Sequence, residues 1–353
     1  MAREKLCVGI DLGASSVKLC QLKRTKTGYA LLNFGLVPLP SEAVVDGALM
    51  NSPRIVEAIQ ELMAAHRIKN KHVALSISGH SVIIKKIPLP QMSAAELQES
   101  IQWEAEQFIP FDIQDVHIDV QIVNQQSAQQ GQMDVVLVAA KKDLVNEYTS
   151  VIIEAGLEPV ICDVDAFAVQ NMFEANYENA LDSTVALVNV GASKTNINII
   201  SGGIPSFTRD LTIGGNAFTE EIQKQMNLSF DEAESLKIGG TASGRDTDVV
   251  IPHDVQRALQ SVAENVTSEV QRSIDFYAAT SADPTPSELY LTGGSARLQA
   301  LARALEARIN VPVHTVDPFR RIALNPQDEG YLRSFGPAAG VAVGLALRYA
   351  GDG

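Results

Sequence analysis

A short pattern occurs twice in this sequence and limits the folds that the chain can adopt. An apolar run typical of a buried strand (residues 6–10) is followed by a small-residue turn and by a second apolar run (17–22). Residues 184–200 repeat this order, and both turns contain Gly-Ala-Ser, beginning at Gly13 and at Gly191. A recurring supersecondary unit indicates an internal duplication. We therefore expect two related lobes.

The residue types in these turns suit a phosphate group. Glycine lets the backbone approach a ligand closely, and successive N–H groups in a turn can form a nest for an anion. A neighbouring carboxylate such as Asp11 can hold Mg²⁺ directly or through water. Short motifs of this kind also occur in ordinary hairpins, so the turn alone leaves both interpretations open.

A third glycine-rich segment follows a predicted strand at residues 288–292. Gly293, Gly294 and Ser295 come next, and residues 296–308 have the spacing of a helix. Backbone without a Cβ can lie flat against a purine, and a helix N-terminus favours anions. The simpler interpretation is a βα turn in which the glycines serve packing.

Composition excludes several classes of protein. Of the 353 residues 46% are hydrophobic and 20% are charged, which predicts a sizeable core and little disorder. The net charge of -14 argues against nucleic acid as a partner, because binding to phosphate backbones depends on clustered Lys and Arg.

Cysteine usage and hydropathy predict a cytoplasmic protein without direct membrane insertion. Cys7, Cys20 and Cys162 lack metal-site spacing and suit a reducing compartment, where we expect them to be small core residues. The first residues run into a strand without a signal segment, and no apolar stretch of 18 residues occurs. The Gly/Ala-rich residues 335–347 predict a tightly packed core helix.

Residues 84–160 predict a compact α/β insert with the order strand, helix, strand, strand, helix. The first strand is expected to end at Pro88-Leu89-Pro90, and a capping box from Ser93 to Glu96 begins the helix. The strands at 116–123 and 135–140 and the helix at 142–155 complete the unit.

The three glycine-rich elements, taken in order, resemble the phosphate 1, phosphate 2 and adenosine motifs of the superfamily of actin, Hsp70 and the sugar kinases. Residues 336–342 are similar to the helix that connects the two lobes in that superfamily, and residues 163–166 fall where its first connecting helix begins. The resemblance covers nearly the whole chain. It implies an α/β, actin-like two-lobed fold with duplicated ribonuclease-H-like subdomains and a small α/β insert subdomain.

The same resemblance implies a division of the chain. Residues 1–83 would form the first part of lobe I, 84–162 the insert, 163–184 the continuation of lobe I, 185–335 lobe II, and 336–353 a C-terminal helix that returns to lobe I.

Within this superfamily, residues 103–112, 214–219 and 233–237 resemble the PilM family of type IV pilus assembly proteins and, more distantly, the cell-division protein FtsA. The resemblance implies a cytoplasmic, ATP-binding scaffold of the inner-membrane assembly platform. It would bind the N-terminal tail of the inner-membrane protein PilN, sit at the membrane through that partner, and link it to the pilus motor ATPases. Self-association is left open.

Residue roles follow from the motifs. Asp11 would hold Mg²⁺, and Asp11 and Asp165 are the catalytic candidates, Asp165 by positioning a water. The residues expected to contact ATP are Gly13, Ala14, Ser15, Ser16, Lys18, Asn189, Gly191, Ala192, Ser193, Lys194, Gly215, Glu234, Lys237, Gly293, Gly294 and Ser295.

Simpler interpretations stand beside three of these roles. Lys18 could be a solvated strand residue, Asp165 a helix cap, and Glu234 with Lys237 a surface ion pair at helical spacing i, i+3.

One position departs from the superfamily, whose phosphate 2 turn usually bears Asp where this chain has Asn189. An amide can accept a hydrogen bond but supplies no charge to Mg²⁺ and no base. We therefore expect at most a weak ATPase, in which bound nucleotide acts as a clamp between the lobes.

The insert helix suggests a docking face. Glu96, Glu99, Glu104 and Glu106 surround Trp103, so this face suits a basic or apolar tail. The alternative is a solvated acidic helix with one packed Trp.

Two other functions remain open. A small-molecule kinase would need an acceptor-site carboxylate motif, and none stands out between residues 75 and 90. An FtsA-like filament protein would be expected to carry a C-terminal amphipathic helix, which does not precede Gly353.

Overall fold

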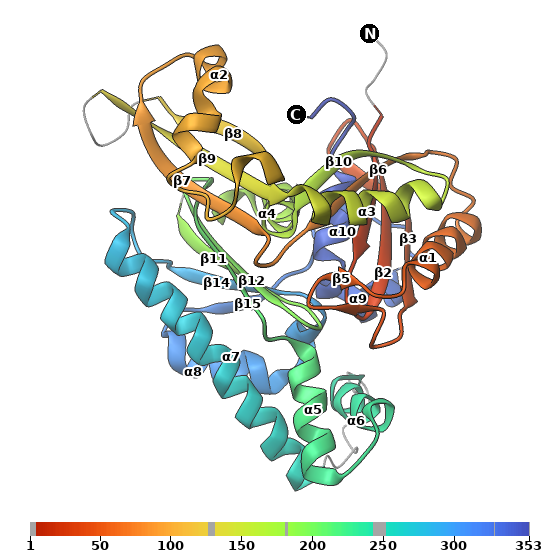
Figure 1. Ribbon diagram of the computed structural model, residues 1–353. Helices are drawn as coiled ribbons and strands as arrows, with labels where there is room; N and C mark the ends of the chain where they lie inside the picture. Colours follow the sequence, from red (N-terminus) through yellow and green to blue (C-terminus); the bar gives the residue numbers. More distant parts are fainter. Residues whose placement is uncertain (1–4, 126–130, 181–182, 243–251, 328, 353) are drawn as a thin grey trace.

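The computed structural model describes residues 5–125, 131–180, 183–242, 252–327 and 329–352. Two lobes, each built on one sheet, lie side by side, and a smaller sheet projects above them (Figure 1). Lobe I contains β1 (Val8–Leu12), β2 (Ser16–Arg24), β3 (Tyr29–Pro38), β4 (Val44–Val45), β5 (Ala48–Leu49), α1 (Ser52–Ala65), β6 (His72–Ile77), α3 (Lys142–Glu154), β10 (Glu158–Val164) and β16 (Ile322–Ala323).

Lobe II follows the first connecting helix, and a second connecting helix ends the fold. Lobe II contains β11 (Thr184–Val190), β12 (Thr195–Ser201), β13 (Ile204–Leu211), α5 (Gly215–Met226), α6 (Phe230–Ala242), α7 (His253–Thr280), β14 (Glu288–Thr292), α8 (Gln299–Ile309) and β15 (Val313–Thr315). The connecting helices are α4 (Asp165–Asn176) and α10 (Gly340–Ala346), and α9 (Glu329–Phe335) precedes α10.

The predicted duplication is present in the sheets. Lobe I has the strand order β10-β6-β1-β2-β3-β16, and lobe II has β15-β14-β11-β12-β13. In each lobe an antiparallel three-stranded meander continues into two parallel strands. The turns of the two first hairpins are closed alike, since Gly13 N–H donates to the Ser16 carbonyl at 3.2 Å and Gly191 N–H to the Lys194 carbonyl at 2.9 Å. The structure confirms the actin-like, duplicated fold.

The two connecting helices pack between the inner faces of the sheets. One apolar cluster joins α4 and α10 to residues of both lobes, including Cys7 and Cys20 of lobe I and Val185 and Leu187 of lobe II. Alternate residues of β11 point instead to α7 and α8, which cover the outer face of lobe II. α4 begins at Asp165, within the predicted residues 163–166, whereas α10 overlaps the predicted residues 336–342 only from Gly340 on, because residues 336–339 form a 3-10 helix.

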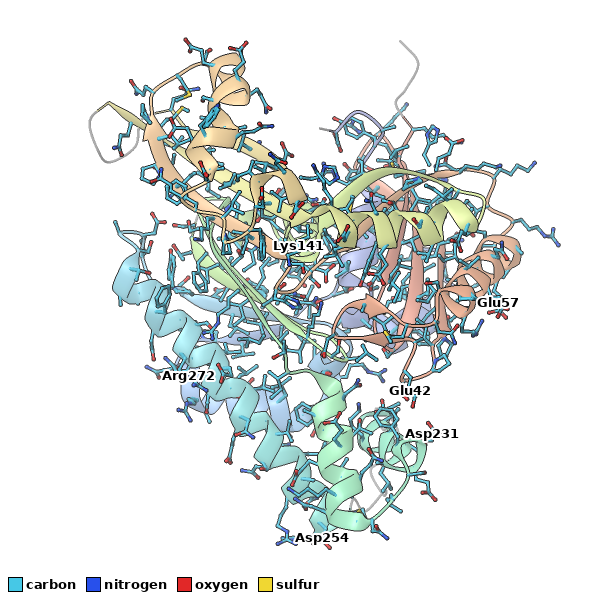
Figure 2. All side chains as sticks on the ribbon, in the orientation of Figure 1. Glu42, Glu57, Lys141, Asp231, Asp254 and Arg272 are labelled. Atoms are coloured by element: carbon cyan, nitrogen blue, oxygen red, sulfur yellow. The ribbon has the colours of Figure 1, made fainter. Side chains whose placement is uncertain are left out.

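α7 carries buried apolar residues at helical spacing along one face. Its residues Val255, Leu259, Val262, Val266, Val270, Ile274 and Tyr277 are buried against lobe II. Charged side chains such as Asp254 and Arg272 of the same helix, and Glu57 of α1, project outward (Figure 2).

The insert sheet has the order β7-β9-β8, formed by β7 (Val82–Pro90), β8 (Val116–Asn124) and β9 (Gln132–Lys141), with α2 (Ala94–Ala105) packed on one face. The capping box at Ser93 and Glu96 is confirmed. Pro88 and Pro90 were expected to end the first strand, yet β7 pairs with β9 through Pro90. β7 is an edge strand, where a missing N–H on the free side costs no ladder hydrogen bond.

Two other expectations differ from the structure. The predicted insert at 84–162 groups α3 and β10 with the insert sheet, whereas β10 pairs in parallel with β6 and α3 packs in the core of lobe I. Cys162 is exposed rather than in the core.

The close packing of α10 generates a prediction. A Cβ at Gly344 would lie 1.7 Å from the carbonyl oxygen of Ala168 in α4, so the two helices would have to separate. We expect Gly344→Ala to lower the free energy of unfolding by about 3 kcal/mol or to prevent folding, measured by guanidinium denaturation. Gly330→Ala in α9 is the control, since a Cβ there meets no atom within 4 Å. Equal midpoints for the two variants would contradict this packing.

Candidate functional site

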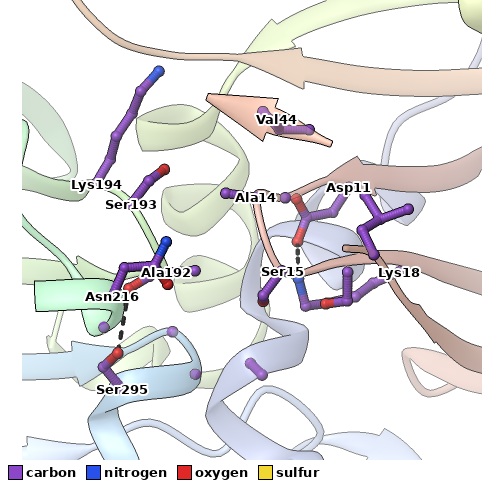
Figure 3. Close-up of a pocket in the computed structure, with 18 of the residues that line it drawn as sticks. Asp11, Ala14, Ser15, Lys18, Val44, Ala192, Ser193, Lys194, Asn216 and Ser295 are labelled. Atoms are coloured by element: carbon purple, nitrogen blue, oxygen red, sulfur yellow. Dashed lines mark hydrogen bonds and ion pairs between the residues drawn. The ribbon is translucent and has the colours of Figure 1, made fainter. Parts of the chain in front are cut away.

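A cleft with a volume of about 550 Å³ opens between the two lobes. The turns of both first hairpins line it from opposite sides, and Ser295 and Asn216 lie at one end (Figure 3). The lining includes every residue that the sequence proposes for the site: Asp11, Gly13, Ala14, Ser15, Ser16, Lys18, Asp165, Asn189, Gly191, Ala192, Ser193, Lys194, Gly215, Glu234, Lys237, Gly293, Gly294 and Ser295. Their individual roles stay predictions.

Asp11 and Lys18 form an ion pair on the lobe I side of the cleft. They face each other across β1 and β2, and Lys18 Nζ donates to Asp11 Oδ2 at 3.0 Å. Lys18 is only 9% exposed, so it is not a solvated strand residue. Burial raises the pKa of the Asp11 carboxyl; the Lys18 ammonium opposes this rise and the Asp165 carboxylate adds to it.

The second hairpin has a neutral pair at the equivalent position. Asn189 and Asn196 are opposite each other on β11 and β12, and Asn189 Nδ2 donates to Asn196 Oδ1 at 2.9 Å. Asn196 was not among the predicted site residues. The duplication contained the signal, because Asn196 follows Asn189 by the interval that separates Lys18 from Asp11.

Two residues on the lobe II side reach across to lobe I. Lys194 Nζ donates to the carbonyl of Ser78 at 2.9 Å. Asp210 of β13 accepts from Asn196 Nδ2 at 2.7 Å and from the N–H of Gly79 at 2.5 Å. Sequence reasoning missed Asp210, which has no local motif around it. In this structure Lys194 is therefore bonded to the opposite lobe.

Asp165 begins α4 at the base of the cleft. Its Oδ1 accepts a hydrogen bond from Ser76 Oγ at 2.6 Å, so Ser76 fixes the orientation of the carboxylate. No side-chain cap hydrogen bond is present at the N-terminus of α4, and the helix-cap interpretation of Asp165 is not supported. The carboxylate is placed where it could orient a water in the cleft.

Glu234 and Lys237 of α6 form a partly buried cluster, which differs from a surface ion pair. Lys237 Nζ lies 2.6 Å from Glu234 Oε2 and donates to Thr219 Oγ1 at 2.9 Å and to the Gly215 carbonyl at 3.1 Å. Burial lowers the pKa of Lys237, and Glu234 opposes this change. The cluster holds α6 against the start of α5.

The glycines at this end of the cleft permit close contact between backbones. A Cβ on Gly215 would lie 2.5 Å from Ser295 Oγ, and one on Gly293 would lie 2.4 Å from the Val190 carbonyl oxygen. Gly293 also has φ 89°, a conformation that disfavours other residues. The glycine segment therefore serves packing as well as access to the cleft.

The donor set limits how a metal ion could be held. Within the described parts of the chain, no group of three or more His, Cys, Asp or Glu side chains is placed to hold a metal ion. Mg²⁺ is often held by one or two carboxylates together with substrate phosphates and water. Asp11 fits that mode.

The strand order and the cleft between duplicated hairpins define a two-lobed protein of the actin-like class. A sequence profile of the family described as type IV pilus assembly protein PilM matches residues 9–350. The chain belongs to this family, and the resemblance drawn from its motifs is confirmed.

Solved structures and curated relatives agree with this assignment. The structure described as the PilM-PilN type IV pilus biogenesis complex has a TM-score of 0.86 at 29% identity, covering 98% of this chain and 99% of that chain. The cell division protein FtsA of Pseudomonas aeruginosa is 22% identical, over 89% of this chain and 84% of its own length. MreB5 of Spiroplasma citri bound to ADP shares the fold, with a TM-score of 0.52 at 13% identity over 97% of this chain and 95% of that chain.

The raised pKa of Asp11 generates a prediction on pH dependence. A carboxyl whose pKa is higher in the folded state binds its proton more tightly there, so its contribution to stability falls as the pH rises from about 4 through the raised pKa. We expect Asp11→Asn to gain stability relative to the nucleotide-free wild type across this window, measured by thermal unfolding from pH 4 to 7. Asp115→Asn, which removes an exposed carboxylate, is the control. A stability difference that does not change with pH would contradict the burial of Asp11.

Proposed function

We propose that this protein is an ATP-binding, actin-like scaffold of the type IV pilus assembly platform in which Mg-ATP acts as a clamp between the lobes. The observation that carries the proposal is the placement of two related small-residue turns on opposite walls of one cleft. A ligand held by both turns stabilises the closed arrangement by mass action. Such a clamp does not require turnover.

Several features of the chain support nucleotide as the ligand. The turns beginning at Gly13 and Gly191 offer backbone N–H groups and the hydroxyls of Ser15, Ser16 and Ser193 to phosphate oxygens. Lys18 and Lys194 supply positive charge at the cleft. Among proteins of the same fold, MreB5 of Spiroplasma citri has been solved with ADP.

Asp11 would hold Mg²⁺ together with the nucleotide phosphates and water. When bound, the ion neutralises charge between the phosphates. Lys18 keeps the Asp11 carboxylate oriented and offsets its burial.

The side chains on the lobe II wall of the cleft support slow hydrolysis of ATP. The equivalent of Asp11 there is Asn189, whose amide donates to Asn196 and cannot act as a base. Asp165, held by Ser76, would orient a water without a second carboxylate at position 189. We therefore infer at most a weak ATPase.

The partner and location follow from the family. We infer that the chain binds the N-terminal cytoplasmic tail of PilN and sits at the inner membrane through it, because the PilM-PilN complex shares 29% identity over nearly the full length of both chains. No described helix is long and apolar enough to cross a membrane. Pilus motor ATPases are proposed as further partners.

α2 offers a face for that tail. Trp103 is 80% exposed, which contradicts a packed tryptophan, and Glu99 and Glu106 are exposed beside it. α2 contains no Lys or Arg, and no basic residue lies in its last turn. A basic tail would find complementary charge and an apolar anchor there.

A double variant tests the clamp. Asp11→Asn with Lys18→Asn copies the neutral pair that the second hairpin already holds at 2.9 Å. We expect the unfolding free energy of the nucleotide-free protein to stay within about 1 kcal/mol of the wild type, because the pair remains hydrogen-bonded. We expect Mg-ATP affinity, measured by calorimetry, to fall roughly 10- to 100-fold with the lost carboxylate and ammonium. Unchanged affinity would reject the assigned roles of both residues.

A peptide titration tests the partner face. Trp103 is the only tryptophan in the chain, so its fluorescence reports on α2 alone. A synthetic PilN N-terminal tail should change this signal saturably, and Glu99→Gln with Glu106→Gln should weaken binding roughly 5- to 30-fold. Glu57→Gln with Glu61→Gln on α1 removes the same charge elsewhere and should change little. Calorimetric binding without a Trp103 response would exclude α2, and no binding by either method would contradict PilN as the partner.

A further inference from the structure

The segment that leads into the insert sheet forms two hydrogen bonds to lobe II through neighbouring backbone groups. Ser78 and Gly79 follow β6 and precede β7, the first strand of the insert sheet. The Ser78 carbonyl accepts from Lys194 Nζ at 2.9 Å, and the Gly79 N–H donates to Asp210 Oδ2 at 2.5 Å. Both contacts lie between the lobes, at the point where the chain leaves lobe I.

Lys194 belongs to the turn that lines the cleft, yet its side chain extends out of that turn (Figure 3). Its ammonium lies between two glycine loops of lobe I. A Cβ on Gly47 would lie 2.5 Å from Nζ, and one on Gly79 would lie 2.6 Å from it. Both glycines have positive φ, 91° and 105°. The space for the ammonium therefore depends on two glycines that the backbone also requires.

Asp210 connects the same segment to the amide on the cleft wall. Three hydrogen bonds run from Asn189 to Asn196, from Asn196 to Asp210, and from Gly79 to Asp210. A carboxylate accepts and does not donate when ionised. The Asp210 carboxylate therefore requires that the NH₂ group of Asn196 face it. The oxygen of Asn196 then faces Asn189, so the NH₂ group of Asn189 is the donor between these two amides.

These hydrogen bonds fix the orientation of the Asn189 side-chain amide at the wall of the cleft. With its NH₂ engaged, Asn189 directs Oδ1 toward Gly293, where a Cβ would lie 2.7 Å from that oxygen. Asp210 itself does not line the cleft. It is thus a positioning residue that acts on Asn189 through Asn196.

We propose that the Ser78–Gly79 segment transmits the state of the nucleotide cleft to the insert sheet, with Lys194 and Asp210 as the connecting side chains. This rests on the proposed binding of ATP. A polyphosphate in the cleft competes with the neutral Ser78 carbonyl for the Lys194 ammonium, because charge-assisted hydrogen bonds to phosphate are stronger. When Lys194 turns to the phosphate, the Ser78 carbonyl loses its hydrogen-bond donor. The residues that lead into β7 then open more often.

Further polar contacts between the insert sheet and lobe II lie on β7, so a change at the start of this strand can reach them. Thr208 Oγ1 of β13 donates to the Ile84 carbonyl at 3.3 Å, and Lys86 lies 3.5 Å from Asp283. Both contacts involve β7 itself, so a change at its first residues is passed to the strand that borders lobe II. The face offered by α2 moves with this sheet.

Hydrogen–deuterium exchange of the full chain tests the connection. In the wild type we expect saturating Mg-ATP to accelerate exchange at residues 79–87 roughly 3- to 10-fold, the effect of losing one hydrogen bond. Without nucleotide, Lys194→Met and Asp210→Ala should already show the faster exchange, and ATP should add little in Lys194→Met. Lys224→Met on α5 removes a charge from lobe II and should behave as the wild type.

Calorimetry at saturating Mg-ATP separates this connection from nucleotide binding, because exchange is then compared only between fully bound proteins. Asp210→Ala removes both the acceptor of the Gly79 N–H and the carboxylate that orients Asn196, so we expect some loss of Mg-ATP affinity together with faster exchange at residues 79–87. If Mg-ATP binds the wild type but leaves or slows exchange there, the connection is rejected and the clamp remains. If Mg-ATP does not bind at all, the proposed function fails and the connection fails with it.

Discussion

The packing of two helices between two sheets is the constraint on which the rest of the molecule depends. α4 and α10 contact each other and residues of both lobes, and at the points of closest approach a glycine stands where a Cβ would clash. Gly344 lies against the Ala168 carbonyl, and Gly9 of β1 lies against the backbone of α10. Since these helices connect the lobes, their spacing sets the width of the cleft and the relative position of its two walls.

The two walls of the cleft have the same backbone arrangement, as a duplication predicts, but their side chains differ in charge. Each hairpin closes its turn with the same hydrogen bond and places a pair of polar residues in the same register. One pair is Asp11 with Lys18, and the other is Asn189 with Asn196. The charged wall suits a metal and phosphate, while the neutral wall holds its amides in one orientation. A site with one acidic wall fits the proposed role, in which nucleotide is bound and hydrolysed slowly.

The sequence was sufficient where the signal is local. The hairpin turns, the capping box at Ser93 and the proposed site residues, all of which line the cleft, were predicted from short patterns, because turn and cap chemistry act over a few residues. Contacts between distant segments were missed. Lys194 reaches Ser78, Asp210 reaches Gly79, and β10 leaves the insert for lobe I, and none of these pairings has a pattern within its own segment. Such contacts depend on how the sheets meet.

The prolines of β7 affect how the insert sheet can associate. β7 and β8 are the two outer strands of this sheet, and each has one edge without a partner strand within it. Pro88 and Pro90 are two residues apart and cannot donate, so part of the outer edge of β7 offers no N–H to an incoming strand. β8 contains no proline. An extended peptide that adds to this sheet by strand pairing would therefore find a complete set of N–H donors along β8, whereas the edge of β7 lacks two of them.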